Sequence, residues 1–268
     1  VEVNIKIAFS APMRAGTLKR EARNRLLAEM TDEVAALVLA NNYQQTLAIS
    51  LAERRGLADL PHQARMMDGL EARGLLNRAV EYLPSPQALA ERQARGQALT
   101  RPELGVLLAY AKLTLFDEVI ASGVPDDPHL RGDLIGYFPA RMAKKFAADI
   151  EGHRLRREIV ATEIGNDAVN RGGPSFISRM QDLTGCPAAD VVAAYAVVRD
   201  GFALPALYRE IDALDNRVGG TTQLGLYQQV GRLVHAATSW LLKNQPAGPI
   251  GARAAALSAA SRELEPAL

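Results

Sequence analysis

The stretch "LTRPELGVLLAYAKLTLFDEVIASG", residues 99–123, contains the most clearly bounded helix signal in the sequence. Thr100 and Glu103 stand three positions apart, which is the spacing of a capping box at a helix N-terminus, and Pro102 fits the first turn. From there to Gly123, apolar side chains cover one face and extend well beyond a narrow stripe. Because a helix with so wide an apolar surface is normally buried on most sides, this segment is predicted to be the central helix.

Helix start and stop signals also divide the rest of the chain. Residues 17–55 are rich in Ala, Leu, Arg and Glu and lack proline, and polar residues at Thr31 and at Asn41 are predicted to break them into two or three helices. Gly56 then suits a left-handed C-terminal cap. Further helices are expected to begin at or near Pro61, Asp127, Pro139, His153, Pro174, Pro187, Pro205 and Thr221, the last one ending near Lys243. The sequence therefore predicts an all-α fold, an irregular multi-helix bundle without a regular repeat.

The composition excludes several classes of protein. Lys and Arg number 31 against 30 Asp and Glu, so the net charge of +1 provides no basic surface for nucleic acid. The single cysteine, Cys186, rules out an internal disulfide framework and suits a reducing compartment, for which the cytoplasm is the default. No window of about 18 residues is apolar without charges, and the first residues lack the features of a signal peptide. We therefore expect a soluble, unexported cytoplasmic protein that neither spans a membrane nor binds nucleic acid.

Short motifs that would place a reaction or a nucleotide on this chain are missing. The sequence has no GxGxxG after a strand, no GxxxxGK[ST], no GxSxG and no HExxH. Its histidines lack the spacing that gathers metal ligands on one face, so no metal site is expected. They are His62, His129, His153 and His235.

Three arginines fall within one helical turn of the segment "HRLRREIV". Arg154, Arg156 and Arg157 could together grip a carboxylate or a phosphate, since guanidinium groups bind such anions with two hydrogen bonds. The favoured interpretation is a solvated helix face whose charge is balanced by Glu151 and Glu158 at helical spacing.

Two further places invite a functional interpretation. Gly172 and Gly173 precede a helix led by Pro174, where free N–H groups could hold an anion. A corner between two helices is favoured instead, because no strand precedes the glycines to form a nucleotide-binding unit. Cys186 precedes Pro187 near a helix N-terminus, a position that can lower the pKa of a thiol, but with no candidate base nearby an inert thiol is favoured.

Five stretches of the sequence resemble, in the same order, the C-terminal region of the large bacterial NAD-specific glutamate dehydrogenases. The similarity extends from about Glu2 to Lys243, and the longest blocks are too long for shared helical composition to explain them. The stretches are "EVNIKI" (2–7), "LTRPELGVLLAYAKLTLFDEVIASGVPDDPHL" (99–130), "YFPARM" (137–142), "HRLRREIVATEIGNDAVNRGGPSF" (153–176) and "LDNRV" (214–218).

The resemblance implies both a reaction and a place for it. In this family, hydride passes from the α-carbon of glutamate to NAD, and the imine that results is hydrolysed to 2-oxoglutarate and ammonium. The family's catalytic lysine and aspartate and its dinucleotide-binding fold lie upstream of the block that resembles residues 2–7. We therefore assign no catalytic, cofactor-binding or metal-binding residue to this chain, and we expect NAD to bind the upstream domain. Lys112, Lys144 and Lys145 lack the surroundings expected of the family's catalytic lysine.

Two roles are open for the segment itself. The favoured one is a helical scaffold, inactive alone, that packs against its own catalytic domain or a neighbouring subunit of a homo-oligomer and fixes that arrangement or transmits regulation. Apolar helices, a balanced charge and the lack of catalytic motifs favour it. The alternative is a stand-alone helical binding module for a regulatory protein or a metabolite, with a groove lined by the arginines.

The resemblance also divides the chain. Residues 1–16 are expected to be a non-core segment, the end of the catalytic, dinucleotide-binding domain with a linker. Residues 17–245 form the C-terminal helical domain, and residues 246–268 form a loose tail rich in small residues. The opening "VEVNIKIAFS", residues 1–10, alternates apolar and polar residues as a half-buried strand does, but so short a run cannot be assigned from its period alone. A capping residue ahead of Val1 would start a helix there, and helix is favoured.

Overall fold

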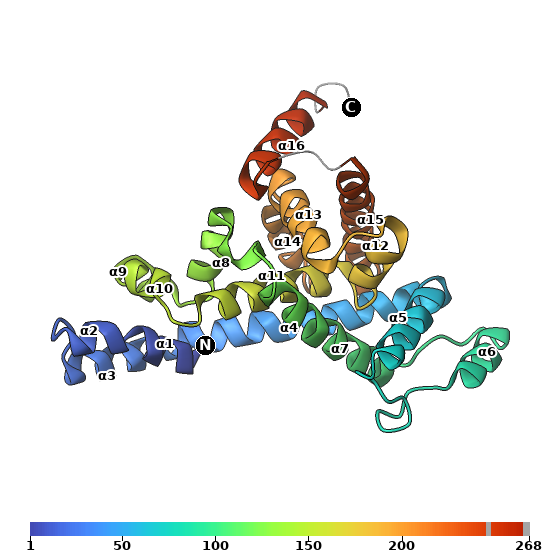
Figure 1. Ribbon diagram of the computed structural model, residues 1–268, viewed down its shortest axis with the longest axis horizontal. Helices are drawn as coiled ribbons and strands as arrows, with labels where there is room; N and C mark the ends of the chain where they lie inside the picture. Colours follow the sequence, from blue (N-terminus) through green and yellow to red (C-terminus); the bar gives the residue numbers. More distant parts are fainter. Residues whose placement is uncertain (245–247, 265–268) are drawn as a thin grey trace.

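The structure is a computed structural model that describes residues 1–244 and 248–264, and within them it contains helices and no strand (Figure 1). The longer helices are α4 (Thr31–Arg55), α5 (Leu60–Ala72), α7 (Arg101–Ile120), α11 (Arg156–Gly172), α13 (Ala188–Gly201), α15 (Gly220–Asn244) and α16 (Ile250–Leu264). The shorter ones are α1 (Glu2–Ala8), α2 (Ser10–Arg14), α3 (Arg20–Glu29), α6 (Pro86–Ala94), α8 (Arg131–Gly136), α9 (Ala140–Lys145), α10 (Ala147–Glu151), α12 (Phe176–Thr184) and α14 (Leu204–Asp212). Single 3-10 turns are η1 (Gly56–Ala58), η2 (Val124–Asp126) and η3 (Pro128–Leu130). The all-α prediction is confirmed.

The helices form a long base and an upright block (Figure 1). In the base, α4 runs from the end that holds α1–α3 to the end that holds α5 and α7, and α6 lies at the edge beyond α5. The block contains α12–α16. α11 joins the two parts, because it packs against α4 and α7 on one side and against α12, α13 and α15 on the other.

α13 is the most completely buried helix. Every residue from Val191 to Val198 except Ala193 is fully enclosed, and the helix is surrounded by α12, α14, α15 and α16. Gly201 lets α16 approach closely, since a Cβ atom there would lie 2.8 Å from Cδ2 of Leu257. None of the described helices is by itself long and apolar enough to cross a membrane. α13 and α14 reach that length and composition only together, across a bend of 69°.

The capping box at the start of α7 forms as predicted. The backbone N–H of Thr100 donates to Oε2 of Glu103 over 2.7 Å, which satisfies one of the free donors at this end. α7 packs against α4 and α11, but its other side faces outward, and 64% of Leu113 is exposed. The helix is therefore less deeply buried than its composition predicted, and α13 takes the central position instead.

α4 is longer than the sequence predicted. The chain does break at Met30, between α3 and α4, but it continues as helix through Asn41. Gln45, one turn further on, donates to Oδ1 of Asn41 over 2.5 Å, so this side chain has a partner that does not compete for backbone hydrogen bonds. α4 ends at Arg55, and Gly56 follows with a φ of 52° that favours glycine, but its ψ of −124° is not that of the left-handed cap predicted there.

The first residues form helix α1, as favoured, rather than a strand. The expectation that this segment lies outside the core is wrong, because Ile5, Ala8 and Phe9 are buried. The ring of Phe9 packs edge-on against Phe146 with centroids 5.0 Å apart. Apolar residues four apart lie on one face of a helix, so Val1, Ile5 and Phe9 fit this helix as well as they fit an alternating strand.

Residues 250–264 form α16, although the sequence predicted a loose tail from residue 246. Ile250 and Ala254 are buried, and α16 packs most extensively against α13. The prediction is wrong over this helix because the small residues that suggested a tail allow two helices to pack closely. Residues 246, 247 and 265–268 of the predicted tail lie outside the described residues.

Candidate functional site

The arginines at the start of α11 are occupied by groups of the protein itself. The Nε atom of Arg157 lies 3.1 Å from Oδ2 of Asp126. The Nη2 atom of Arg156 lies 3.6 Å from Oδ1 of the same carboxylate. A second nitrogen of Arg157 donates to two carbonyls at the end of α7, those of Ile120 and Ser122. Such bonds satisfy acceptors that the helix leaves free, so this arginine ties α11 to α7.

The partners predicted for these arginines were wrong. Glu151 pairs with Arg131 instead, and in the described part of the chain Glu158 has no basic group within 4.0 Å. Arg154 is exposed, as a solvated helix face requires. The sequence located the basic turn correctly, but the acidic group that balances it comes from η2, which is distant in sequence.

The glycines between α11 and α12 form a packed corner. A Cβ atom on Gly172 would lie 2.3 Å from the ring of Phe176, and one on Gly173 would lie 2.3 Å from Nη2 of Arg55. Gly173 also has a φ of 98°, which other residues rarely adopt. Protein side chains therefore fill the space beside the glycines. His235 donates from Nε2 to the carbonyl oxygen of Gly172 over 3.1 Å.

The other candidates do not come together. Cys186 is a free thiol that lies 3.9 Å from the carbonyl oxygen of Thr184. Burial lowers the pKa of Lys112 to about 8, whereas Lys144 and Lys145 are exposed at the end of α9. Among the residues that the structure describes, no group of three His, Cys, Asp or Glu side chains is placed to hold a metal ion.

The histidines have separate partners. His62 lies 2.6 Å from Arg65, His129 lies 2.7 Å from Asp200, and His153 bonds a carbonyl oxygen of α1.

A buried ion network centres on Arg199, and the sequence did not reveal it. Nη1 of Arg199 lies 2.5 Å from Asp133 and 3.6 Å from Asp167, and Nε lies 2.7 Å from Asp200. Tyr195 donates its hydroxyl to Asp167 over 2.9 Å. The network ties α8, α11 and α13 together. Asp133, Asp167 and Arg199 come from helices about thirty residues apart in sequence, so no local pattern could have revealed that they meet.

Burial and charge act in opposite directions on these carboxylates. Burial raises the pKa of Asp167, although Arg199 and Arg171 act to lower it. For Asp200, burial alone would raise the pKa, but the hydrogen bond and charge of Arg199 lower it overall. Glu163, one turn before Asp167 on α11, has its pKa raised to about 7 by burial and by the nearby acidic groups. Arg199 and the aspartates around it are paired with one another, as is typical of an ion network that stabilises the fold.

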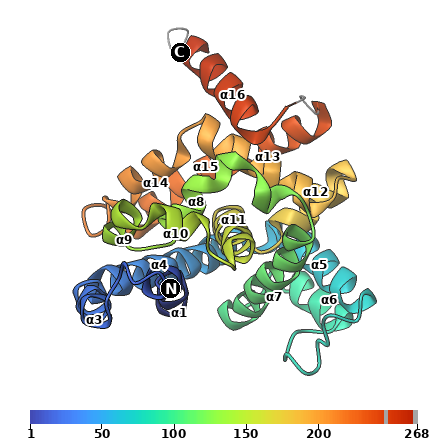
Figure 2. The same ribbon diagram turned by 60° about the vertical axis from the view of Figure 1, so that its left-hand side comes forward.

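An uncovered apolar segment lies in the first half of α4. Residues 34–40 read "VAALVLA", and most of their side chains are exposed, including 46% of Val38 and 66% of Leu39. A helix that is apolar around its whole circumference is normally buried. We call the exposed side chains of this run the α4 patch: Ala35, Ala36, Val38, Leu39 and Ala40. Figure 2 brings this part of α4 forward, beside α1 and α3. Val3 on α1 is exposed as well.

In the part of the chain that the structure describes, these features define a helical domain with its own core and with an apolar segment of α4 left uncovered. Residues 96–268 match the family described as "Glutamate dehydrogenase, C-terminal", and residues 1–52 match the family described as "Bacterial NAD-glutamate dehydrogenase, catalytic domain". The chain therefore belongs to the bacterial NAD-specific glutamate dehydrogenase family, of which it is a C-terminal region. The resemblance seen in the sequence is confirmed. The catalytic-domain match runs past residue 16, where the sequence analysis placed the end of that domain.

Relatives support the same assignment. The chain is 48% identical over 244 residues to the NAD-specific glutamate dehydrogenase of Pseudomonas aeruginosa and 42% identical to that of Halomonas elongata. It is 37% identical over 245 residues to the enzyme of the same name from Mycobacterium tuberculosis. Each match covers 91% of this chain but only 15% of the relative, so the chain spans a small part of their length. No solved structure matches it significantly.

Proposed function

We propose that this chain is the helical scaffold of an NAD-dependent glutamate dehydrogenase, docked on its own catalytic domain through the α4 patch. The whole enzyme converts L-glutamate, NAD and water into 2-oxoglutarate, ammonium and NADH. The catalytic and NAD-binding groups lie upstream, and the segment alone is inactive. It takes part in a homo-oligomer. We place the enzyme in the cytoplasm, whose reducing conditions suit the free thiol of Cys186.

One observation carries the docking proposal. The match to the catalytic-domain family ends at residue 52, yet α4 continues as one helix from Thr31 to Arg55. Its second half is buried in this domain at Ala48, Leu51 and Ala52, while its first half carries the α4 patch. One continuous helix thus has one end in the helical core and an uncovered apolar end. The rest of the catalytic domain, to whose family residues 1–52 are similar, is the covering partner we propose.

The test compares the same substitutions in two settings. Leu39→Asp puts a charge on the α4 patch, and Leu113→Asp puts one on α7 as the matched control, because the two leucines are 66% and 64% exposed. In the chain of residues 1–268 both variants are expected to unfold at nearly the wild-type temperature, because these side chains face water. In the complete enzyme, the α4 variant loses about 3 kcal/mol of stability and most of its glutamate-dependent NADH production, because a charge enters an apolar interface.

Two results would contradict the proposal. One is an α4 variant that behaves like Leu113→Asp in the complete enzyme. The other is appreciable turnover of glutamate and NAD by residues 1–268 alone, because that would place the reaction in this segment.

A further inference from the structure

An open groove of about 610 Å³ lies between the end of α4, η1, α12 and α15. Its size is in the range of sites for small molecules. Four apolar side chains line it: Ala58, Met180, Leu183 and Ala236. The polar lining consists of Gln228, Ser239, Asp59, His235 and three arginines, which are Arg55, Arg179 and Arg232. The groove begins at Arg55, the last residue of α4, whereas the α4 patch lies in the first half of that helix.

The arginines leave a net positive charge in this groove. Arg55 is held in place, with Nε 2.5 Å from Oδ2 of Asp59 and its guanidinium packed against Gly173. In the part of the chain that the structure describes, neither Arg179 nor Arg232 has a carboxylate within 4.0 Å. Two guanidinium groups are therefore available to an oxyanion, which each of them can bind with two hydrogen bonds.

The uncharged imidazole ring of His235 also lines the groove. Burial, together with the charges of Arg179 and Arg55, lowers the pKa of His235 to about 4, so the ring is neutral at pH 7. The proton sits on Nε2, which donates to the carbonyl oxygen of Gly172. Nδ1 is then an acceptor, and it is buried without a partner among the described groups. The positive charge of the groove comes from arginines alone.

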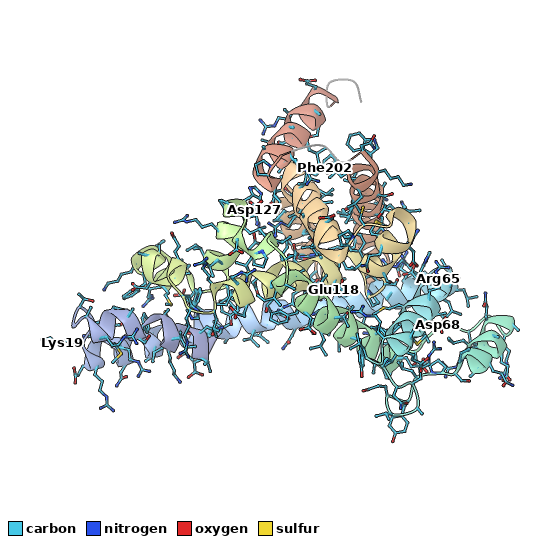
Figure 3. The ribbon with its side chains drawn as sticks, viewed as in Figure 1. Lys19, Arg65, Asp68, Glu118, Asp127 and Phe202 are labelled. Atoms are coloured by element: carbon cyan, nitrogen blue, oxygen red, sulfur yellow. The ribbon has the colours of Figure 1, made fainter. Side chains whose placement is uncertain are left out.

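In a neighbouring hollow of the same molecule, carboxylates neutralise the arginines. It has a volume of about 190 Å³ and lies between α5, α7 and α12. Arg65 there pairs with Asp182 over 3.2 Å, and Arg73 pairs with Glu118 over 3.1 Å. Figure 3 labels Arg65 and Glu118 on their two helices. Each arginine in that hollow has its own carboxylate, whereas the larger groove has two arginines without one.

We propose that the groove binds a small organic anion with two oxyanion groups, carboxylate or phosphate, which are held by Arg179 and Arg232. The body of the ligand lies on the apolar side chains of Met180 and Leu183. This site differs from the arginine turn at the start of α11, where the guanidinium groups are already occupied. It does not depend on docking through the α4 patch, since the groove is formed within residues 55–239.

The experiment titrates the chain of residues 1–268 with two probes, pyrophosphate and succinate, against potassium chloride at equal ionic strength. Binding is measured by isothermal titration calorimetry and by the unfolding temperature. At about 10 mM probe we expect a saturable heat of binding and a rise in unfolding temperature of about 3 °C. The stronger response shows whether phosphate or carboxylate is the preferred group.

Three variants separate the groove from general charge effects. Arg179→Gln combined with Arg232→Gln is expected to weaken binding at least tenfold. Arg179→Lys keeps the charge but loses the bidentate hydrogen bonding of a guanidinium group, so it is expected to weaken binding less than the double variant does. Arg156→Gln removes a positive charge outside the groove and should leave binding unchanged.

The inference is overturned if neither probe gives a saturable response, or if the double variant binds as tightly as the wild type. Far-ultraviolet circular dichroism of each variant identifies any that fails to fold, and Arg179→Lys then provides the comparison.

Discussion

Replacing Arg199 with methionine removes the cation at the centre of the buried ion network. Methionine retains much of the aliphatic stem, so the substitution mainly deletes the charge and its hydrogen bonds. Asp133, Asp167 and Asp200 then lose a partner that lies 2.5, 3.6 and 2.7 Å away, respectively.

The cost follows from how deeply these carboxylates are placed. Removing one partner of a buried ion pair typically costs about 3–5 kcal/mol, because the remaining charge is left without compensation. The three aspartate side chains retain between 14% and 27% of their exposure, so water recovers part of the loss. We therefore expect the lower end, a loss of about 3 kcal/mol in the free energy of unfolding at neutral pH.

The loss should depend on pH in a defined direction. In the wild type, Arg199 lowers the pKa of Asp200, and this contributes stability that is present above the unfolded pKa and lost as pH falls through the lowered folded pKa. Burial raises the pKa of Asp167 even in the presence of Arg199, which acts to lower it, so removing Arg199 raises that pKa further above the value in the unfolded chain. The folded variant then takes up protons as pH falls, so its deficit should shrink from pH 8 towards pH 5.

Urea unfolding followed by circular dichroism at several pH values measures both effects. The matched control is Arg131→Met, because Arg131 forms an exposed ion pair with Glu151 that is expected to contribute less than about 1 kcal/mol. The reasoning is refuted if Arg199→Met costs no more than this control, or if its deficit stays the same across the pH range.

Three further substitutions test packing and titration. Gly172→Ala would place Cβ 2.3 Å from the ring of Phe176, so we expect the free energy of unfolding in urea to fall by about 2 kcal/mol. Gly225 on α15 has open space beside it, so Gly225→Ala should raise the free energy of unfolding by about 0.5 kcal/mol. Burial and nearby carboxylates raise the pKa of Glu163 to about 7, so the wild type should lose stability as pH rises from about 4.5 through 7. Glu163→Gln should flatten that profile and stabilise by about 2 kcal/mol at pH 8, and an unchanged profile would contradict this assignment.

Local signals in the sequence predicted most of the helices. They failed where contacts with residues distant in sequence determine whether a segment is helical. The capping box of Thr100 and Glu103 needs only residues within one turn, so α7 begins where predicted. α16 was missed, because its stability comes from packing against α13 at Gly201, which lies about fifty residues earlier. The break predicted at Asn41 failed for a local reason instead, because Gln45, four residues later, can hydrogen-bond the Asn41 side chain within the helix.

The sites were less predictable than the fold. Arg154, Arg156 and Arg157 are adjacent in sequence and drew attention for that reason, yet two of them are bound to a carboxylate of η2. The arginines that line the groove come from α4, α12 and α15, so only the folded chain brings them together. The α4 patch was visible as an apolar run, but its exposure depends on which helices pack beside it.

Hydrogen exchange tests the central claim, that the α4 patch is covered by the catalytic domain. The amides of residues 34–40 are measured by mass spectrometry in the chain of residues 1–268 and in the complete enzyme. An uncovered helix segment opens easily, so we predict at least tenfold slower exchange of these amides in the complete enzyme, with little change in α13, which is already enclosed. Equal exchange of residues 34–40 in the two settings would contradict the account.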